Sequence, residues 1–183
     1  AVSAFLATIM LNAQISHLDV PVFDFLLQNL YLSLIFTIFA ITGLSNAYNI
    51  IDGFHGLSSM VGTITLIGIG YVALQVNDDF IANASFIGAS AIFGFFICNF
   101  PLGKIFLGDG GAYLIGFWIA TLSVLIVDRN PSVSPWFALL INAYPIMETI
   151  FSMYRRKFHQ GKSPGHPDGV HFHSLIFRRV VNR

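Results

Sequence analysis

Long apolar runs, each bounded by polar residues, constrain this 183-residue chain more than any other feature. A helix needs about 20 apolar residues to cross the core of a bilayer. Runs of about this length predict six membrane spans, the first of them short, at residues 1–15, 26–45, 57–76, 84–100, 111–127 and 135–154. The runs are too long for barrel strands and lack two-residue alternation, and backbone groups that face lipid must be bonded within the span. We therefore expect every span to be a helix.

The composition indicates the same class of protein. Mean hydropathy is +0.73 and 10% of the residues are charged, whereas soluble domains average about 25% charged residues. We expect an all-α fold, a polytopic transmembrane helical bundle that forms one domain over residues 1–183 and ends in a tail at 155–183. The formal net charge is zero, so no nucleic-acid partner is expected.

The basic residues are unevenly distributed between the two sides of the membrane. Successive connections alternate sides, so the connections at residues 46–56, 101–110 and 155–183 share one side. That side contains all the lysines and arginines except Arg129, which lies on the other side. Because Lys and Arg concentrate in cytoplasmic loops, these three connections are predicted to be cytoplasmic.

One of these connections contains a carboxylate among glycines, Gly108-Asp109-Gly110-Gly111. Glycine allows the backbone to approach a ligand closely. A carboxylate in such a turn suits Mg²⁺, which takes one or two protein carboxylates together with substrate phosphates. The alternative is a solvated Asp109 that caps the next helix.

Asn46, Asn49 and Asp52 follow one another at intervals of three residues. If the preceding helix continues through them, they form a polar stripe on one face. The two amides could bond a sugar, a base or a phosphate, and Asp52 could accept a proton or position a cation. The alternative is a hydrogen-bonded cluster between helices, or a capped helix end.

The tail contains His171 and His173 after a basic run. The basic residues of that run are Arg155, Arg156, Lys157 and Lys162. Such cations could neutralise a diphosphate. The alternative is a basic loop that rests on anionic lipid headgroups.

Glu148 lies late in the last span, three residues after Pro145. An acid at the centre of a span costs about 2.5–3.5 kcal/mol on insertion scales, so it normally faces protein or water. Pro145 removes a helix hydrogen bond and allows a bend. We therefore expect Glu148 to lie close enough to the cytoplasmic end to join a site there.

Together these blocks resemble the polyprenyl-phosphate N-acetylhexosamine-1-phosphate transferases, which form glycosyltransferase family 4. The N-x-x-N-x-x-D-G segment is matched by Asn46, Asn49, Asp52 and Gly53. The K-x-F-x-G-D-x-G segment is matched by Lys104, Phe106, Gly108, Asp109 and Gly111. The third segment is matched by Pro145, Glu148, Thr149, Ser163, Pro164, Pro167, Asp168, His171 and His173. The resemblance covers about residues 30–180, and the tail is similar to the undecaprenyl-phosphate GlcNAc-1-phosphate transferase-like branch, which starts O-antigen, teichoic-acid and related glycans.

The resemblance implies a multi-pass enzyme of the bacterial cytoplasmic membrane. It would transfer N-acetylhexosamine-1-phosphate from a UDP-sugar to polyprenyl (undecaprenyl) phosphate and release UMP. The implied cofactor is Mg²⁺, with Mn²⁺ as an alternative, and Asp109 is the implied metal ligand. The implied catalytic residues are Asp52, Asp109 and His171. The implied substrate-binding residues are Asn46, Asn49, Lys104, Glu148, Arg155, Arg156, Ser163, Asp168 and His173. The expected partners are UDP-N-acetylhexosamine, polyprenyl phosphate, the lipid bilayer and a second copy in a homodimer.

The chain departs from the family pattern at four points. His55 stands where the family commonly has Asp or Asn, Glu148 where it has Asp, and Ser174 where this branch often has another His. The family's paired aspartates on an earlier cytoplasmic loop are absent. The only Asp-Asp pair in the sequence, Asp78-Asp79, is expected on the opposite side of the membrane and cannot replace them. We therefore expect an N-terminally truncated part of a longer enzyme, inactive by itself.

Two other functions remain open. A secondary transporter could use Glu148, Asp52 and Asp109 as coupling sites, although transporters usually place such groups near the midplane on paired broken helices. A membrane zinc hydrolase could use His171 and His173 as ligands. Substrate uptake into sealed vesicles would favour the transporter, and sensitivity to zinc chelation would favour the hydrolase.

Overall fold

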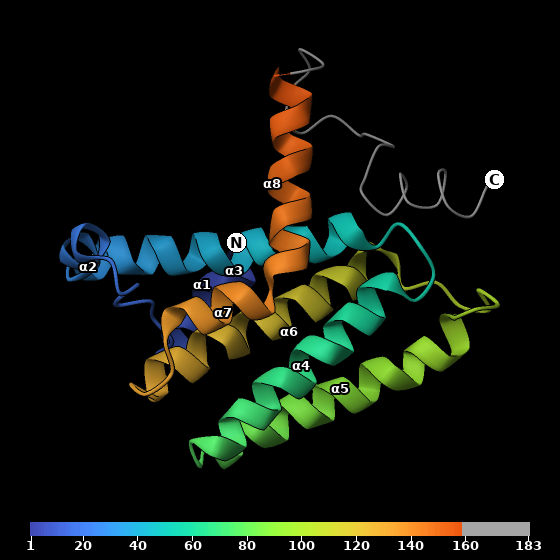
Figure 1. Cartoon of the computed structure of the whole chain (residues 1–183), viewed down its shortest axis with the longest axis horizontal. Helices are drawn as coiled ribbons and strands as arrows, with labels where there is room; N and C mark the ends of the chain where they lie inside the picture. The colour runs from blue at the N-terminus through green and yellow to red at the C-terminus, as the bar shows by residue number, and fades with distance from the viewer. Residues whose placement is uncertain (159–183) are drawn as a thin grey trace.

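The computed structural model describes residues 1–158, and all the regular secondary structure in that range is helical (Figure 1). The helices are α1 (Val2–Met10), α2 (Pro21–Leu27), α3 (Leu30–Ile51), α4 (Leu57–Gln75), α5 (Asp79–Asn99), α6 (Gly108–Arg129), α7 (Pro135–Ile141) and α8 (Ala143–Phe158). This confirms the all-α prediction.

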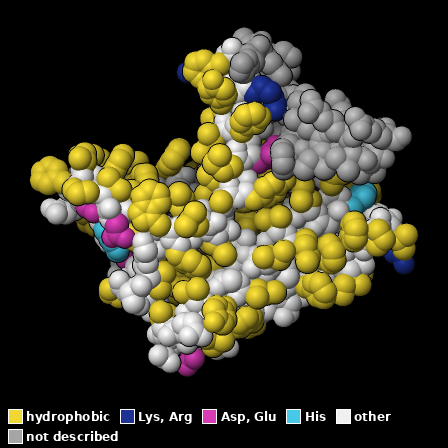
Figure 2. All heavy atoms as spheres, in the orientation of Figure 1, with side chains coloured by type: hydrophobic (Ala, Val, Ile, Leu, Met, Phe, Trp, Pro, Cys, Tyr) yellow, Lys and Arg dark blue, Asp and Glu magenta, His cyan; other side chains and the backbone are white. Residues whose placement is uncertain are grey.

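Within residues 1–158, four helices, α3 to α6, are long and apolar enough to cross a membrane, and the bent pair of α7 and α8 is a fifth if it counts as one span. The expected span at residues 1–15 contains only the nine-residue α1, which is about 14 Å long at 1.5 Å per residue. Hydrophobic side chains cover most of the face shown in Figure 2, with few charged side chains among them. The chain is therefore part of a multi-pass membrane protein.

α3 and α6 pack closely where their small residues meet. A Cβ atom on Gly116 of α6 would lie 2.7 Å from the Cα of Ser45 and 2.9 Å from the Cβ of Tyr48, both on α3. Glycine is therefore required there for the two backbones to approach, as is common between membrane helices. This contact places the C-terminal half of α3 beside the N-terminal half of α6.

Asp78 joins the start of α5 to the end of α6 at the other end of the bundle. Its carboxylate accepts hydrogen bonds from Arg129 Nε at 2.8 Å and Asn130 Nδ2 at 3.2 Å, both at the end of α6. It also accepts one from the backbone amide of Ile81 and so caps α5. Burial of Asp78 disfavours its charged form, but these hydrogen bonds outweigh that effect, so its pKa lies below the usual range.

Asp78→Asn is expected to lower the free energy of unfolding by about 1–2 kcal/mol at pH 7, because it removes the ion pair but keeps an oxygen for the cap. Arg129 is half exposed, which limits the effect. A carboxylate with a lowered pKa stabilises the fold above its unfolded-state pKa and loses that contribution as the pH falls through the folded-state value. The difference between variant and parent should therefore disappear in acid. Unfolding in mixed detergent micelles measures it, with the exposed neighbour Asp79→Asn as control.

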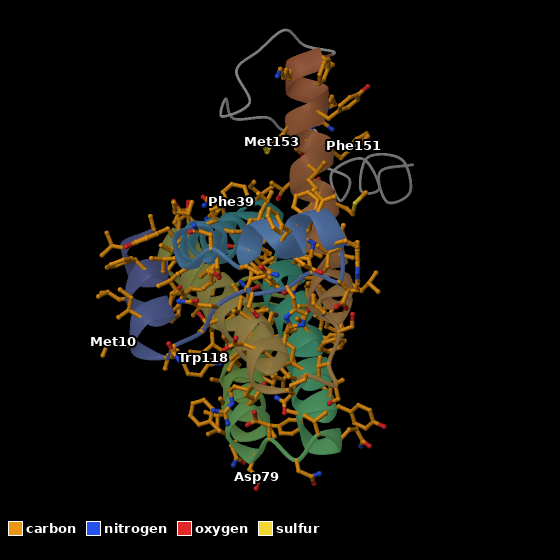
Figure 3. All side chains as sticks on the ribbon, turned by 90° about the vertical axis from the view of Figure 1, so that its left-hand side faces the viewer. Met10, Phe39, Asp79, Trp118, Phe151 and Met153 are labelled. Carbon is orange, nitrogen blue, oxygen red and sulfur yellow. The ribbon has the colours of Figure 1, made fainter. Side chains whose placement is uncertain are left out.

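The expected span at 135–154 is broken in the structure. α7 and α8 meet at Asn142 with a bend of 72°, three residues before Pro145, where the sequence indicated a bend. Pro145 lacks the amide hydrogen that would bond the carbonyl of Ile141, so the helix cannot continue regularly through this turn. α8 crosses α3 and projects from the bundle, with Phe151 and Met153 on the projecting part (Figures 1 and 3).

Candidate functional site

The polar stripe at the end of α3 lies on one continuous helix. α3 continues through Asn46 and Asn49 to Ile51, and Asp52 is its C-terminal cap. The expected span ended at residue 45, so the helix is longer than expected and meets the condition under which Asn46 and Asn49 share a face. Asn46 is exposed, whereas Asn49 and Asp52 are half-buried, so the stripe becomes partly covered toward the helix end.

Asp109 lies in the first turn of α6 rather than in the loop before it. The helix begins at Gly108, three residues earlier than the expected span, and Gly108 has a φ of +65° that favours glycine. A carboxylate is favourable in a first turn because the helix dipole is positive there. Asp109 also has a partner outside its helix, since Asn49 Nδ2 donates a hydrogen bond to Asp109 Oδ1 at 3.2 Å. Two of the three sequence blocks therefore meet.

Asp52 and Asp109 are close enough to interact electrostatically. The pKa of Asp52 is raised to about 6, mainly by burial and further by the negative charge of Asp109, while His55 partly offsets the increase. The end of α3 and the start of α6 thus form a small region of concentrated negative charge.

This pair of acids fits a magnesium ion by the chemistry of its donors. Mg²⁺ takes one or two carboxylates and completes its coordination with water and substrate phosphates. Within residues 1–158, no three His, Cys, Asp or Glu side chains come together as a complete metal site. Asp109 is suited to be such a carboxylate ligand, and a cation beside it would relieve its repulsion with Asp52.

Asn46 faces a different neighbour from Asn49. Its side chain donates to the carbonyl of Thr42 at 2.8 Å and accepts a hydrogen bond from the hydroxyl of Tyr113 at 3.3 Å. Asn46 and Tyr113 line a cavity of about 470 Å³ between α1, α3 and α6. The structure therefore places Asn46 one turn away from the Asn49–Asp109 contact, facing this cavity.

Asn99 is a site residue that the sequence analysis missed. It is 4% exposed at the end of α5, where its side chain accepts from the amide of Gly56 at 2.6 Å and donates to the carbonyl of Ile105 at 2.7 Å. Its own carbonyl accepts from the amide of Gly103 at 2.7 Å. Asn99 thus joins the loop after Asp52 to the loop before Asp109. A polar side chain in the last turn of an apolar helix was the signal for it, since such a group needs partners.

His55 and Phe106 extend the site beyond the two acids. The amide nitrogen of Asn99 lies 3.4 Å from His55 Nδ1, and the centroids of the His55 and Phe106 rings are 5.3 Å apart. Both rings are exposed, as is Lys104 on the same loop as Phe106. This surface presents two aromatic rings, one of which, His55, acts on Asp52, and an exposed cation on the loop of Phe106.

The third sequence block is only partly within the described residues. Glu148 is 5% exposed on α8, which packs against α3. Arg155 is half-buried, with its guanidinium carbon 5.9 Å from the centroid of the Phe151 ring. Arg156 belongs to α8, and its side chain is not described. Ser163, Asp168, His171 and His173 lie outside the described residues, so their meeting with the other two blocks stays a prediction.

The family model and the similar curated proteins point to the same family. The model of glycosyl transferase family 4 matches residues 1–127. The chain is 34% identical over 147 residues to the undecaprenyl-phosphate alpha-N-acetylglucosaminyl 1-phosphate transferase of Escherichia coli (strain K12), and 33% identical over 147 residues to that of Salmonella typhi. It is 30% identical over 146 residues to the protein of the same name from Thermotoga maritima.

These alignments cover most of this chain but less than half of each relative. They include 78% of this chain for the Escherichia coli and Salmonella typhi proteins and 80% for the Thermotoga maritima protein. They cover 40%, 40% and 44% of those relatives, so the chain spans less than half the length of the curated relatives it matches. The family model and these identities confirm the resemblance seen in the sequence, and the chain belongs to glycosyl transferase family 4.

Proposed function

We propose that this chain contributes the metal and substrate site of an enzyme that transfers N-acetylhexosamine-1-phosphate from a UDP-sugar to polyprenyl phosphate. The observation that carries the proposal is the hydrogen bond between Asn49 and Asp109, which are 60 residues apart in the sequence. It brings two polar blocks together at one end of an apolar bundle. The names of the curated relatives support a polyprenyl-phosphate acceptor.

The proposed reaction joins two phosphates. A phosphate oxygen of the lipid attacks the phosphorus bonded to the sugar, a new P–O bond forms, and the bond to UMP breaks. The protein needs no covalent intermediate for this, because such transfers depend mainly on alignment and charge neutralisation. Mg²⁺ held by Asp109 would neutralise diphosphate oxygens and the departing phosphate.

The side chains of this chain have separate roles in the proposal. Asn49 orients the carboxylate of Asp109 through its amide. Asp52, with a pKa raised to about 6, is suited to accept the proton of the attacking phosphate near neutral pH. Lys104 supplies a cation for a phosphate oxygen, and the exposed rings of Phe106 and His55 provide faces for stacking a nucleobase.

The lipid acceptor accounts for the position of the site. A polyprenyl chain stays in the bilayer, so its phosphate reaches only groups at the membrane surface. The site lies at the ends of two membrane helices, and the basic bias of the sequence favours the cytoplasmic surface. We therefore propose the cytoplasmic face of a bacterial inner membrane, where UDP-sugars are available.

The proposal predicts lipid-linked product and UMP in equal amounts. Membranes from cells that express the protein from its native gene are incubated with undecaprenyl phosphate, Mg²⁺ and labelled UDP-GlcNAc, UDP-GalNAc or UDP-glucose. An N-acetylhexosamine donor should label the lipid fraction above the background of cells without the gene, whereas UDP-glucose should not. Sealed vesicles that accumulate a substrate with no lipid product would contradict the proposal and favour the transporter.

A further inference from the structure

The bend between α7 and α8 leaves two carbonyls without their usual helical partners. The amide of Asn142 bonds to the carbonyl of Leu140, so the carbonyl of Ala138 loses the hydrogen bond that a regular helix would give it. The carbonyl of Ile141 would pair with residue 145, which is a proline without an amide hydrogen. In the interior of a membrane protein such groups need other donors, because no bulk water is present to supply them.

Side chains supply both missing donors. Asn142 Nδ2 donates to the carbonyl of Ala138 at 2.9 Å, so this residue caps the helix that it ends. The hydroxyl of Thr65, on α4, donates to the carbonyl of Ile141 at 3.5 Å. The break is therefore completed by a residue within it and by a neighbouring helix.

These two side chains belong to a buried cluster that joins four parts of the fold. The hydroxyl of Tyr48 on α3 donates toward Thr65 Oγ1 at 3.2 Å and Asn142 Oδ1 at 3.5 Å. Asn142 Nδ2 also donates to Ser123 Oγ on α6 at 3.0 Å. Tyr48 and Asn142 are 0% exposed, and Thr65 and Ser123 are 3% and 4% exposed. We call Tyr48, Thr65, Ser123 and Asn142 the break cluster.

The break cluster is directly connected to the candidate site. Tyr48 precedes Asn49, whose side chain bonds to Asp109, so adjacent residues of α3 contact the break and the site. α8 starts at the break, packs against α3, and contains Glu148 and Arg155. A change in the direction of α8 would therefore move both of these side chains relative to the end of α3.

We propose that the break cluster is a positioning device that fixes the direction of α8, with Asn142 and Thr65 as its determining residues. Asn142 donates to Ala138 on α7 and to Ser123 on α6, and Thr65 on α4 donates to the carbonyl of Ile141, so the residues from which α8 starts are held relative to α4, α6 and α7. Losing a donor leaves a buried carbonyl unpaired, which favours other helix directions. The expected effect of the break cluster on turnover rests on the proposed transferase function. Its effect on the direction of α8 is independent of that function.

Distances between spin labels test the proposal in lipid nanodiscs. Cys98 is first replaced by Ser, and labels are attached at Ile87→Cys on α5 and Met153→Cys on α8, both exposed positions. Thr65→Val removes the hydroxyl at nearly constant volume, whereas Thr65→Ser keeps it. Met153 is eleven residues beyond Asn142, so a rotation of about 20° moves the label by roughly 5 Å.

We expect Thr65→Val and Asn142→Leu to shift or broaden this distance by about 5 Å, and Thr65→Ser to restore the parent distance. A second label pair, Ile87→Cys with Trp136→Cys on α7, should not change. Asn83→Leu, at an exposed asparagine of α5, is the matched control for Asn142→Leu. Equal distances in Thr65→Val, Thr65→Ser and the parent would overturn the proposal, and so would the same shift in both label pairs, because that would indicate general loosening.

Turnover provides a separate measurement. If the transferase function is correct, Thr65→Val should lower kcat by about tenfold to a hundredfold, and Thr65→Ser should recover most of it. A shifted distance with no transfer in the parent protein would contradict the proposed function but support the positioning role. Normal transfer with a shifted distance would contradict the role of α8 in turnover.

Discussion

Asp109→Asn is expected to lower Mg²⁺-dependent sugar-phosphate transfer by at least about 10³-fold. The substitution keeps the size of the side chain and its oxygen for Asn49, but removes the charge that would hold the cation. Asp109 is exposed, so the fold should change little. Initial rates in membranes at several Mg²⁺ concentrations provide the measurement, with thermal unfolding of the purified variant as the check on folding.

Asp79→Asn is the matched control for this experiment. Asp79 and Asp109 are both exposed acids in the first turn of a long apolar helix, and Asp79 lies at the far end of the molecule from α8 (Figure 3). We expect the control to retain parental rates. If Asp109→Asn also retained Mg²⁺-dependent rates, Asp109 would not be the metal ligand, and its role would be limited to the contact with Asn49 and the positive end of the α6 dipole.

Asn99→Leu is expected to reduce both activity and stability. The amide of Gly56 is buried and would lose its acceptor, while the carbonyl of Ile105 would lose its donor. One buried and one partly exposed unpaired group cost about 2–4 kcal/mol in the free energy of unfolding. The loops that present Asp52 and Asp109 would no longer be joined, so we expect transfer to fall by about a hundredfold or more.

The matched control is Asn83→Leu, because Asn83 is an exposed asparagine on the same helix. Unfolding in mixed micelles and transfer rates should be measured for both variants. A second variant, Asn99→Asp, keeps an acceptor for Gly56 but removes the donor to Ile105, and should fall between the parent and Asn99→Leu. Parental stability and rates in Asn99→Leu would show that the two loops are held together by other contacts.

The sequence predicted the parts of this protein that depend on local chemistry. Apolar runs of membrane length predict helices because a lipid-facing backbone must bond to itself, and α3 to α6 follow that prediction. The spacing of Asn46, Asn49 and Asp52 indicated a stripe on one face if the helix continued past residue 45, and α3 does continue to Ile51. The order of the motif blocks predicted the family.

The remaining features depend on partners distant in the sequence. The sequence could not show that Asp109 meets Asn49, because the two residues belong to different helices, α6 and α3. It also could not show that the two asparagines of the stripe bond different partners on α6. Pro145 indicated a bend, but the break lies at Asn142 because Thr65 and Ser123 are placed to bond it there. In the sequence, Asn99 lies at the end of an apolar run. Its role in joining the loops of Gly56 and Ile105 depends on contacts that only the fold brings together.

The sequence by itself determined that the chain is a set of membrane helices with two polar blocks of glycosyl transferase family 4 at their ends, because hydrophobicity and motif spacing are local properties. The tertiary structure decided which polar atoms meet. An unpaired polar group in a membrane interior costs several kcal/mol, so each one needs a specific partner, and close packing of α3, α4 and α6 selects that partner from residues far along the chain.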